Sequence, residues 1–78
     1  MLMAKLPVVS SLELIKCLQK VGFEVDHVKG SHFILRSSGG THLTVPKRKV
    51  LGKGLLLKII IKAGLTKEQF CLLLGKKL

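Results

Sequence analysis

Residues 23–46 read FEVDHVKGSHFILRSSGGTHLTVP, and this stretch decides the fold. Its first residues alternate between apolar and polar, which is typical of a half-buried strand. Lys29-Gly30 and Ser38-Gly39-Gly40 supply turn residues that predict two tight connections, and Pro46 stops the last strand because proline has no N–H to donate. The stretch therefore predicts an antiparallel meander of three strands, over residues 23–28, 32–37 and 41–45.

A helix is predicted directly before these strands, over residues 11–21. Ser10 begins a Ser-Ser-Leu-Glu capping box, in which the Ser10 hydroxyl caps the helix and Glu13 bonds back to the N–H of the capping residue. Gly22 can adopt the left-handed conformation that ends a helix. Apolar residues follow at helical spacing, at Leu12, Ile15, Leu18 and Val21.

Two further helical segments follow the strands. Residues 55–63 are apolar on nearly every side except at Lys58 and Lys62, and Gly64 ends this helix. Thr66-Lys-Glu-Gln is a second capping box that starts a short helix through Phe70 and Leu74. In the longer helix we expect Leu56, Ile59, Ile60 and Ala63 in the core and leave Leu57 and Ile61 open between core and partner contact.

The element order predicts an α+β fold with the sequence α-β-β-β-α. Two helices of this length can cover only one face of a three-stranded sheet, so the other face should stay open. A short C-terminal helix completes the arrangement. The chain has 78 residues, which is enough for one domain and excludes a two-domain enzyme, so residues 1–78 are expected to form a single domain.

The charge balance indicates a polyanionic partner. Fourteen Lys and Arg residues stand against four Asp and Glu residues, giving a formal net charge of +10. No carboxylate occurs between His27 and Lys67. A surface that carries mainly positive charge favours nucleic acid binding over a general contribution to solubility. A docking patch for partner proteins is a weaker alternative.

Other features narrow the class of protein. Cys17 and Cys71 belong to no CxxC pair and fall within apolar helical patterns, which predicts buried thiols in a reducing compartment. No signal peptide or membrane span is recognisable, so a cytoplasmic protein without membrane association is expected. Tyr and Trp are absent, and the three Phe residues are predicted to point inward; they are Phe23, Phe33 and Phe70. Binding of nucleic acid by base stacking on an aromatic platform is therefore not expected.

Few residues can carry chemistry. No Gly-rich nucleotide-binding fingerprint is present, the carboxylates do not cluster, and no cofactor or metal is expected. A zinc site built from His27, His32 and His42 is the weak alternative. Histidine also performs acid-base catalysis without a metal, and cations beside it stabilise charge on phosphorus. His32 is the best candidate because it follows Gly30-Ser31, where the backbone can approach a phosphate closely.

Six blocks of sequence follow one another along most of the chain. They are Gly22-Phe23, Lys29-Gly30-Ser31-His32, Thr44-Val45-Pro46, Lys53 to Ile60, Ala63-Gly64-Leu65 and Glu68-Gln69-Phe70. In this order and spacing the blocks resemble the HicA family of toxins from bacterial toxin-antitoxin systems. The resemblance covers about residues 6–70 and implies a fold like that of double-stranded-RNA-binding domains, ribosome-independent cleavage of mRNA, and neutralisation by a HicB antitoxin. The implied fold agrees with the element order predicted above.

The resemblance assigns the catalytic histidine of the family's Gly-Ser-His motif to His32. Family members often have a second histidine directly after the motif, where this chain has Phe33, and another two residues after the strand-ending proline, where this chain has Arg48. These departures leave His32 without an obvious second histidine partner.

The function expected from these features is that of a toxin that cleaves RNA as a metal-independent endonuclease, an mRNA interferase, through His32. A non-catalytic RNA-binding module of the same fold is the alternative. The expected partners are mRNA and an acidic HicB-like antitoxin that covers the basic loop and His32, and possible further antitoxin contacts are Leu57 or Ile61. The residues expected to contact RNA are Lys29, Gly30, Ser31, Lys47, Arg48, Lys49 and Lys53.

Overall fold

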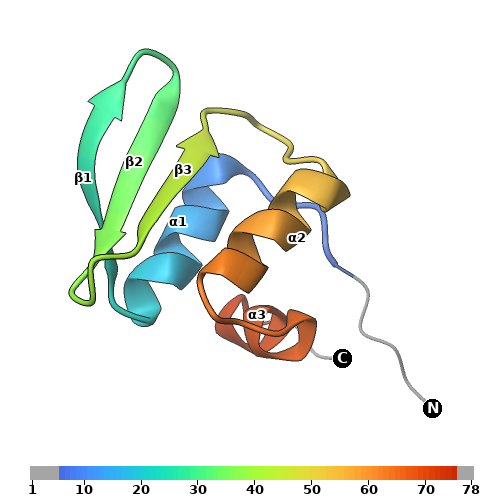
Figure 1. The fold of residues 1–78 in the computed structure, drawn as a ribbon. Coiled ribbons are helices and arrows are strands. Elements are labelled where there is room, and N and C mark those ends of the chain that lie inside the picture. The colour runs from blue at the N-terminus through green and yellow to red at the C-terminus, as the bar shows by residue number, and fades with distance from the viewer. Residues whose placement is uncertain (1–5, 76–78) are drawn as a thin grey trace.

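An antiparallel sheet with the strand order β1-β2-β3 organises the chain. The computed structural model describes residues 6–75. Both ends of β2 lead directly into tight turns, so the three strands follow one another as the predicted meander (Figure 1). The elements are α1 (Ser11–Lys20), β1 (Phe23–Lys29), β2 (His32–Ser37), β3 (His42–Pro46), α2 (Lys53–Lys62) and α3 (Lys67–Leu73).

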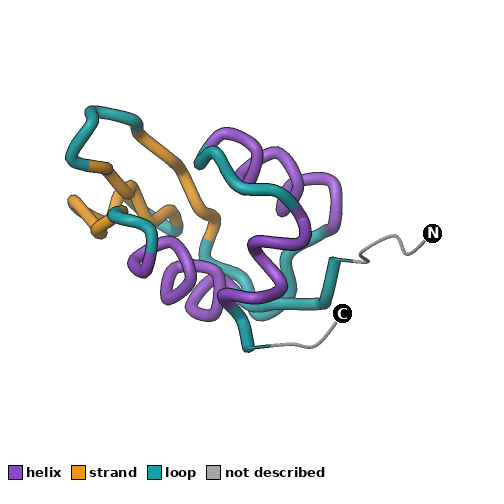
Figure 2. The backbone as a smooth tube through the Cα atoms, turned by 90° about the horizontal axis from the view of Figure 1, so that it is seen from below, coloured by secondary structure: helices purple, strands orange, loops and turns teal. Residues whose placement is uncertain are grey.

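The helices lie on one side of the sheet and leave its other face open. Helix α1 contacts β1 and β3, α2 contacts β3, and α3 contacts both α1 and α2. The view from below shows the strands on one side and the helices on the other (Figure 2). The predicted α+β class and the α-β-β-β-α order with an added short helix are confirmed.

Both predicted capping boxes are formed. The Glu13 backbone N–H donates to Ser10 Oγ at 3.2 Å, and the Ser10 N–H donates to Glu13 Oε1 at 2.9 Å. Thr66 and Gln69 make the same reciprocal pair at 3.1 and 2.9 Å. Helix α2 begins at Lys53, two residues before the predicted start at residue 55, so Gly54 belongs to its first turn.

The core fills the space between the helices and the covered face of the sheet. Cys17 and Cys71 are buried, as predicted. Of the residues expected in the core from α2, Ala63 is only partly buried, and Leu57 packs partly buried against the core, whereas Ile61 is 61% exposed. The largest side chains with almost no exposed surface are Leu14, Leu18, Leu35, Leu43, Leu56, Ile60 and Phe70.

Strand β1 is less buried than its alternating pattern predicted. Only Phe23 is buried along the strand, while Val25 and Val28 are 38% and 50% exposed. Two structural facts account for this difference. The strand forms an edge of the sheet, and its register with β2 shifts between Val25 and His27, which interrupts the regular alternation.

The third strand is shifted by one residue from the prediction. It starts at His42 and includes Pro46, which pairs with His32 of β2. A proline fits there because β3 is an edge strand and Pro46 is its last residue. Within residues 6–75, no helix is long and apolar enough to cross a membrane.

Candidate functional site

The turn between β1 and β2 carries the residues of the Gly-Ser-His motif. Gly30 has a φ of +58°, in the left-handed region that side chains other than glycine adopt at a cost. An added Cβ would meet no atom within 4 Å, so the requirement for glycine is one of conformation and not of space. Ser31 and His32 are exposed directly after it.

His32 faces the open side of the sheet. Leu35 is fully buried beneath the helices, so the alternation along β2 places His32, Ile34 and Arg36 on the opposite face. Residues directly opposite one another in an antiparallel pair share a face. Lys29 of β1 and Pro46 of β3 are the two residues opposite His32. Lys29 therefore lies beside His32 on the open face.

The basic loop after β3 is tied to this turn through its backbone. The Lys47 N–H donates to the Ser31 carbonyl at 2.7 Å. At its other end, the Leu51 N–H donates to the Val9 carbonyl at 2.8 Å. The chain that carries Lys47, Arg48 and Lys49 is thus anchored beside the motif turn rather than free to move away from it.

Ser11 holds the middle of the loop, and the sequence analysis missed this role. Its hydroxyl accepts from the Arg48 N–H at 2.6 Å and lies within hydrogen-bond distance of the carbonyls of Pro46 and Arg48, to which it can donate. The Ser11 N–H also donates to the Arg48 carbonyl at 3.0 Å. Among residues 6–75, Ser11 is the only polar residue in the buried class. In the sequence, the helix cap at Ser10 already explains the Ser-Ser pair, so no separate role is expected for Ser11.

The Lys47 side chain turns toward the helix side of the sheet. Its Nζ lies 5.6 Å from the centre of the Phe33 ring, a cation–π contact that contributes about 0.5–1 kcal/mol at an exposed site. Phe33 pairs with buried Val45, so its ring lies on the face that the helices cover. The prediction of an inward Phe33 is met only in part, because this residue remains half-exposed.

A hollow of about 260 Å³ lies at this place between the loop, the start of α1 and the sheet. Three of the predicted RNA-contacting residues line it, and Leu12 contributes an exposed apolar side chain. His32 does not line it, because this histidine faces the other side of β2. The lining residues are Ser10, Ser11, Leu12, Phe33, Lys47, Arg48 and Lys49.

The predicted site residues therefore form two groups at one end of the sheet. Lys29, Gly30, Ser31 and His32 occupy the motif turn and the open face, while the basic loop lines the hollow on the helix side. The hydrogen bond from Lys47 to Ser31 joins them. Lys53 belongs to neither group, because it is the first residue of α2 at the far end of the loop (Figure 1).

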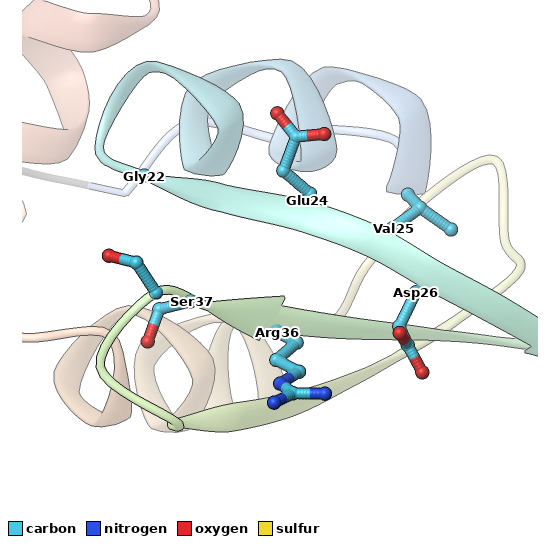
Figure 3. Close-up of a pocket in the computed structure, with 7 residues that line it drawn as sticks. Gly22, Glu24, Val25, Asp26, Arg36 and Ser37 are labelled. Atoms are coloured by element: carbon cyan, nitrogen blue, oxygen red, sulfur yellow. The ribbon is translucent and has the colours of Figure 1, made fainter.

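A second hollow, of about 400 Å³, lies toward the opposite end of the β1–β2 hairpin. Glu24 and Asp26 line it together with Arg36, and the Asp26 and Arg36 side chains extend to the same side (Figure 3). Its carboxylates make it a poorer site for a phosphate backbone than the basic loop.

The ionisable groups beside this hollow include one close pair. His27 Nδ1 lies 2.8 Å from Asp26 Oδ2. The hydrogen bond from His27 is the main cause that lowers the pKa of Asp26. Desolvation opposes it, and the charges of His27, Arg36 and His42 lower the pKa further. No three His, Cys, Asp or Glu side chains within residues 6–75 are grouped so that they could hold a metal ion.

The fold and the site together describe a small, basic α+β domain that exposes a histidine beside a glycine turn and a loop of cations. A family model of the HicA toxins of bacterial toxin-antitoxin systems matches residues 12–65. The match spans well over half of the 78-residue chain, so the chain belongs to the HicA toxin family. It is a toxin whose partner in such a system is an antitoxin. No curated protein matches it.

Proposed function

We propose that this toxin is an RNA endonuclease, an mRNA interferase, in which His32 moves a proton during cleavage. The observation that carries the proposal is the position of His32. It is exposed on the open face of the sheet, with Lys29 opposite and the Gly30-Ser31 turn directly before it. An accessible imidazole beside a cation and exposed backbone suits acid-base chemistry at a phosphodiester.

The substrate is RNA because its own 2′-hydroxyl can serve as the nucleophile. Removal of the 2′-hydroxyl proton by a histidine lets the oxygen attack the adjacent phosphorus, and the bond from phosphorus to the 5′ oxygen breaks. The extra negative charge on the phosphoryl oxygens is stabilised by nearby cations. The register of β1 and β2 supports this role for Lys29, because it sets Lys29 opposite His32.

The backbone of the RNA would continue from His32 over the motif turn onto the basic loop. Gly30 and Ser31 position the scissile phosphate, and Lys47, Arg48 and Lys49 contact phosphates beyond it. The 2.7 Å hydrogen bond from Lys47 to Ser31 supports this path, because it keeps the loop at the end of the strand that carries His32. Lys53, at the start of α2, would contact RNA only if the strand follows the whole loop.

Cleavage should not require a divalent metal. The chain has four carboxylates, and magnesium-dependent phosphoryl transfer needs clustered oxygen ligands. Within residues 6–75, the structure brings no three potential ligands together. Proton transfer by histidine together with charge stabilisation by lysine supplies a mechanism from the residues that are present.

The test is RNA cleavage by the purified protein in EDTA, with His32→Ala and His42→Ala compared. His42 is a matched control, because it is also an exposed histidine on the open face, but it lies opposite Arg36, away from the motif turn. We expect cleavage in EDTA, a loss of about 100-fold or more in His32→Ala, and little change in His42→Ala.

Two results would contradict the proposal. Loss of all cleavage in EDTA with recovery in magnesium would exclude the metal-independent mechanism. RNA binding without cleavage by the wild-type protein, and without growth arrest on expression, would instead indicate the non-catalytic RNA-binding module.

The antitoxin is proposed to be an acidic, HicB-like protein that covers His32 and the basic loop. The net charge of +10 would attract such a partner over a distance. Leu12 and Val28 are exposed near the hollow and the motif turn, which adds apolar contact area beside the cations. Of the two α2 residues considered for partner contact, Ile61 remains available, whereas Leu57 is partly buried against the core.

A further inference from the structure

A β-bulge in β1 brings Asp26 and His27 to the same face of the sheet. Val25 pairs with Leu35 and His27 pairs with Ile34, so Asp26 is an extra residue without a partner of its own in β2. Neighbouring residues of a regular strand point to opposite faces. In a bulge, two residues of one strand oppose a single residue of the other. Asp26 and His27 therefore both lie on the open face, opposite Ile34.

The bulge is what allows these neighbours to form a hydrogen bond. His27 Nδ1 lies 2.8 Å from Asp26 Oδ2, and both side chains are accessible, at 55% and 44% exposure. Because the pKa of Asp26 is lowered, its carboxylate is ionised and acts as the acceptor, with the Nδ1–H as the donor. The other ring nitrogen, Nε2, is then the one that can exchange a proton with a substrate.

His27 is a diagonal neighbour of His32 on this face. It pairs with Ile34, and His32 lies two residues before Ile34 on β2. Diagonal neighbours on adjacent strands are separated by roughly 7–8 Å, within reach of long and aromatic side chains. Two imidazole rings at this spacing can contact the two sides of one phosphodiester. No such relationship holds for His42, which lies on β3 opposite Arg36.

We propose that His27 is a second catalytic residue of the RNA cleavage, acting as the general acid, and that Asp26 is its positioning residue. The inference rests on the proposed function. His32 accepts the proton of the 2′-hydroxyl as the bond from O2′ to phosphorus forms. The Nε2–H of His27 gives a proton to the 5′ oxygen as the bond from phosphorus to that oxygen breaks. The products are a 2′,3′-cyclic phosphate and a 5′-hydroxyl, and the two histidines end with exchanged protonation states.

The neighbouring groups assign the two roles. The Asp26 carboxylate accepts the Nδ1–H of His27, which leaves the Nε2 of that ring as the nitrogen that can give a proton to the leaving oxygen. His32 directly follows the Gly30-Ser31 turn and has Lys29 opposite, where the scissile phosphate and its 2′-hydroxyl are proposed to lie. The charged and titratable groups on or beside this face are Glu24, Asp26, His27, Lys29, His32, Arg36 and His42.

The test compares an ordinary RNA dinucleotide with one whose 5′-bridging oxygen at the scissile phosphate is replaced by sulfur. A thiolate leaves without a proton from a general acid. We expect His27→Ala to lose about 100-fold or more in the cleavage rate of the ordinary substrate and to cleave the sulfur substrate near the wild-type rate. His32→Ala should be defective on both substrates, because the 2′-hydroxyl still requires a base.

Asp26→Asn should show a smaller loss on the ordinary substrate that also disappears on the sulfur substrate. A merely structural role of Asp26 would reduce cleavage of both substrates equally. Asp26→Glu, which keeps a carboxylate acceptor, should recover part of the activity. Thermal unfolding of each variant shows whether the fold is intact, and His42→Ala serves as the control for removing an exposed histidine from the same face.

The outcomes separate this inference from the proposed function. If the wild-type protein cleaves RNA and depends on His32, but His27→Ala is fully active on the ordinary substrate, the second catalytic residue is refuted and the nuclease remains. Equal defects of His27→Ala on both substrates also refute the role as general acid. If the wild-type protein cleaves neither substrate, the proposed function itself fails.

Discussion

The Ser11 hydroxyl, at the start of α1, lies 2.6 Å from the backbone nitrogen of Arg48 in the basic loop. The two residues are 37 positions apart in the sequence. Because the bond uses the Arg48 backbone, the position of the loop does not depend on the Arg48 side chain. The guanidinium is exposed and available for a phosphate while the chain beneath it is held.

Ser11→Ala should destabilise the protein by about 1–3 kcal/mol, since it leaves the Arg48 N–H without its acceptor and removes the hydroxyl donor beside the Pro46 carbonyl. Urea denaturation measures this as a lower free energy of unfolding. Ser38→Ala, in an exposed turn, is the control and should change stability by less than about 0.5 kcal/mol. Equal stability of the two variants would show that the Ser11 hydrogen bonds contribute nothing net.

RNA affinity should depend strongly on salt. For single-stranded RNA, the slope of log K against log salt is about −0.7 per phosphate neutralised, so three to five contacts predict roughly −2 to −3.5. Changing Lys47, Arg48 and Lys49 to Gln together should flatten the slope by about 2 without altering base preference. The folded structure should persist because the loop is anchored through its backbone and Ser11.

A matched control removes the same charge elsewhere. Lys16, Lys58 and Lys62 are exposed on α1 and α2, away from the loop, and their replacement by Gln should change the slope much less. Fluorescence anisotropy with a short RNA, in the inactive His32→Ala background, measures both. A slope that is equal in the two triple variants would indicate that net charge alone matters and would argue against the loop as the RNA site.

Charge reversal in the loop should affect how quickly the antitoxin binds. Exposed charges at the edge of an interface act mainly on the encounter of the two proteins, so Lys47→Glu with Lys49→Glu should lower the association rate more than it raises the dissociation rate. Stopped-flow measurements at several salt concentrations with the purified antitoxin separate the two rates. An effect confined to dissociation would instead place these lysines at the buried centre of the interface.

Asp26 should make stability depend on pH in the acid range. Its pKa is lowered from the ordinary value of 3.8 in the folded protein, chiefly by the hydrogen bond from His27. The Asp26 carboxylate therefore binds a proton less readily in the folded state than in the unfolded state. Its contribution to the free energy of unfolding is present above the pKa of the unfolded state and is lost as pH falls through the pKa of the folded state. The difference in urea midpoint between wild type and Asp26→Asn should shrink as pH falls from about 5 to about 2. A difference that does not change with pH would contradict this.

Local signals in the sequence were sufficient for the elements and their order. The capping boxes at Ser10 and Thr66 are formed, and Gly30 and Gly40 take the positive φ angles that their turns require. The second strand has the predicted limits, His32–Ser37. These features depend on residues close together in the chain, where conformational preference and hydrogen bonds within one turn determine the outcome.

The burial of β1 and the roles of Ser11 and Lys47 were decided by contacts between distant parts of the chain. Alternation along β1 could not show that the helices leave Val25 and Val28 exposed. The serine pair gave no sign that Ser11 would reach the loop, and the run of cations gave no sign that Lys47 would turn to the Phe33 ring. Each depends on where the helices and the loop pack against the sheet.

His32 was found from the sequence because its signal is local, a histidine after a glycine turn. The pairing of Asp26 with His27 was not, since neighbouring residues in a regular strand point to opposite faces. The register between β1 and β2 leaves one extra residue, Asp26, between the pairs formed by Val25 and His27. This bulge turns the side chains of Asp26 and His27 to the face that carries His32. The register is a relationship between two strands and is not determined by either strand alone. The tertiary structure therefore decided which histidine is the diagonal neighbour of His32.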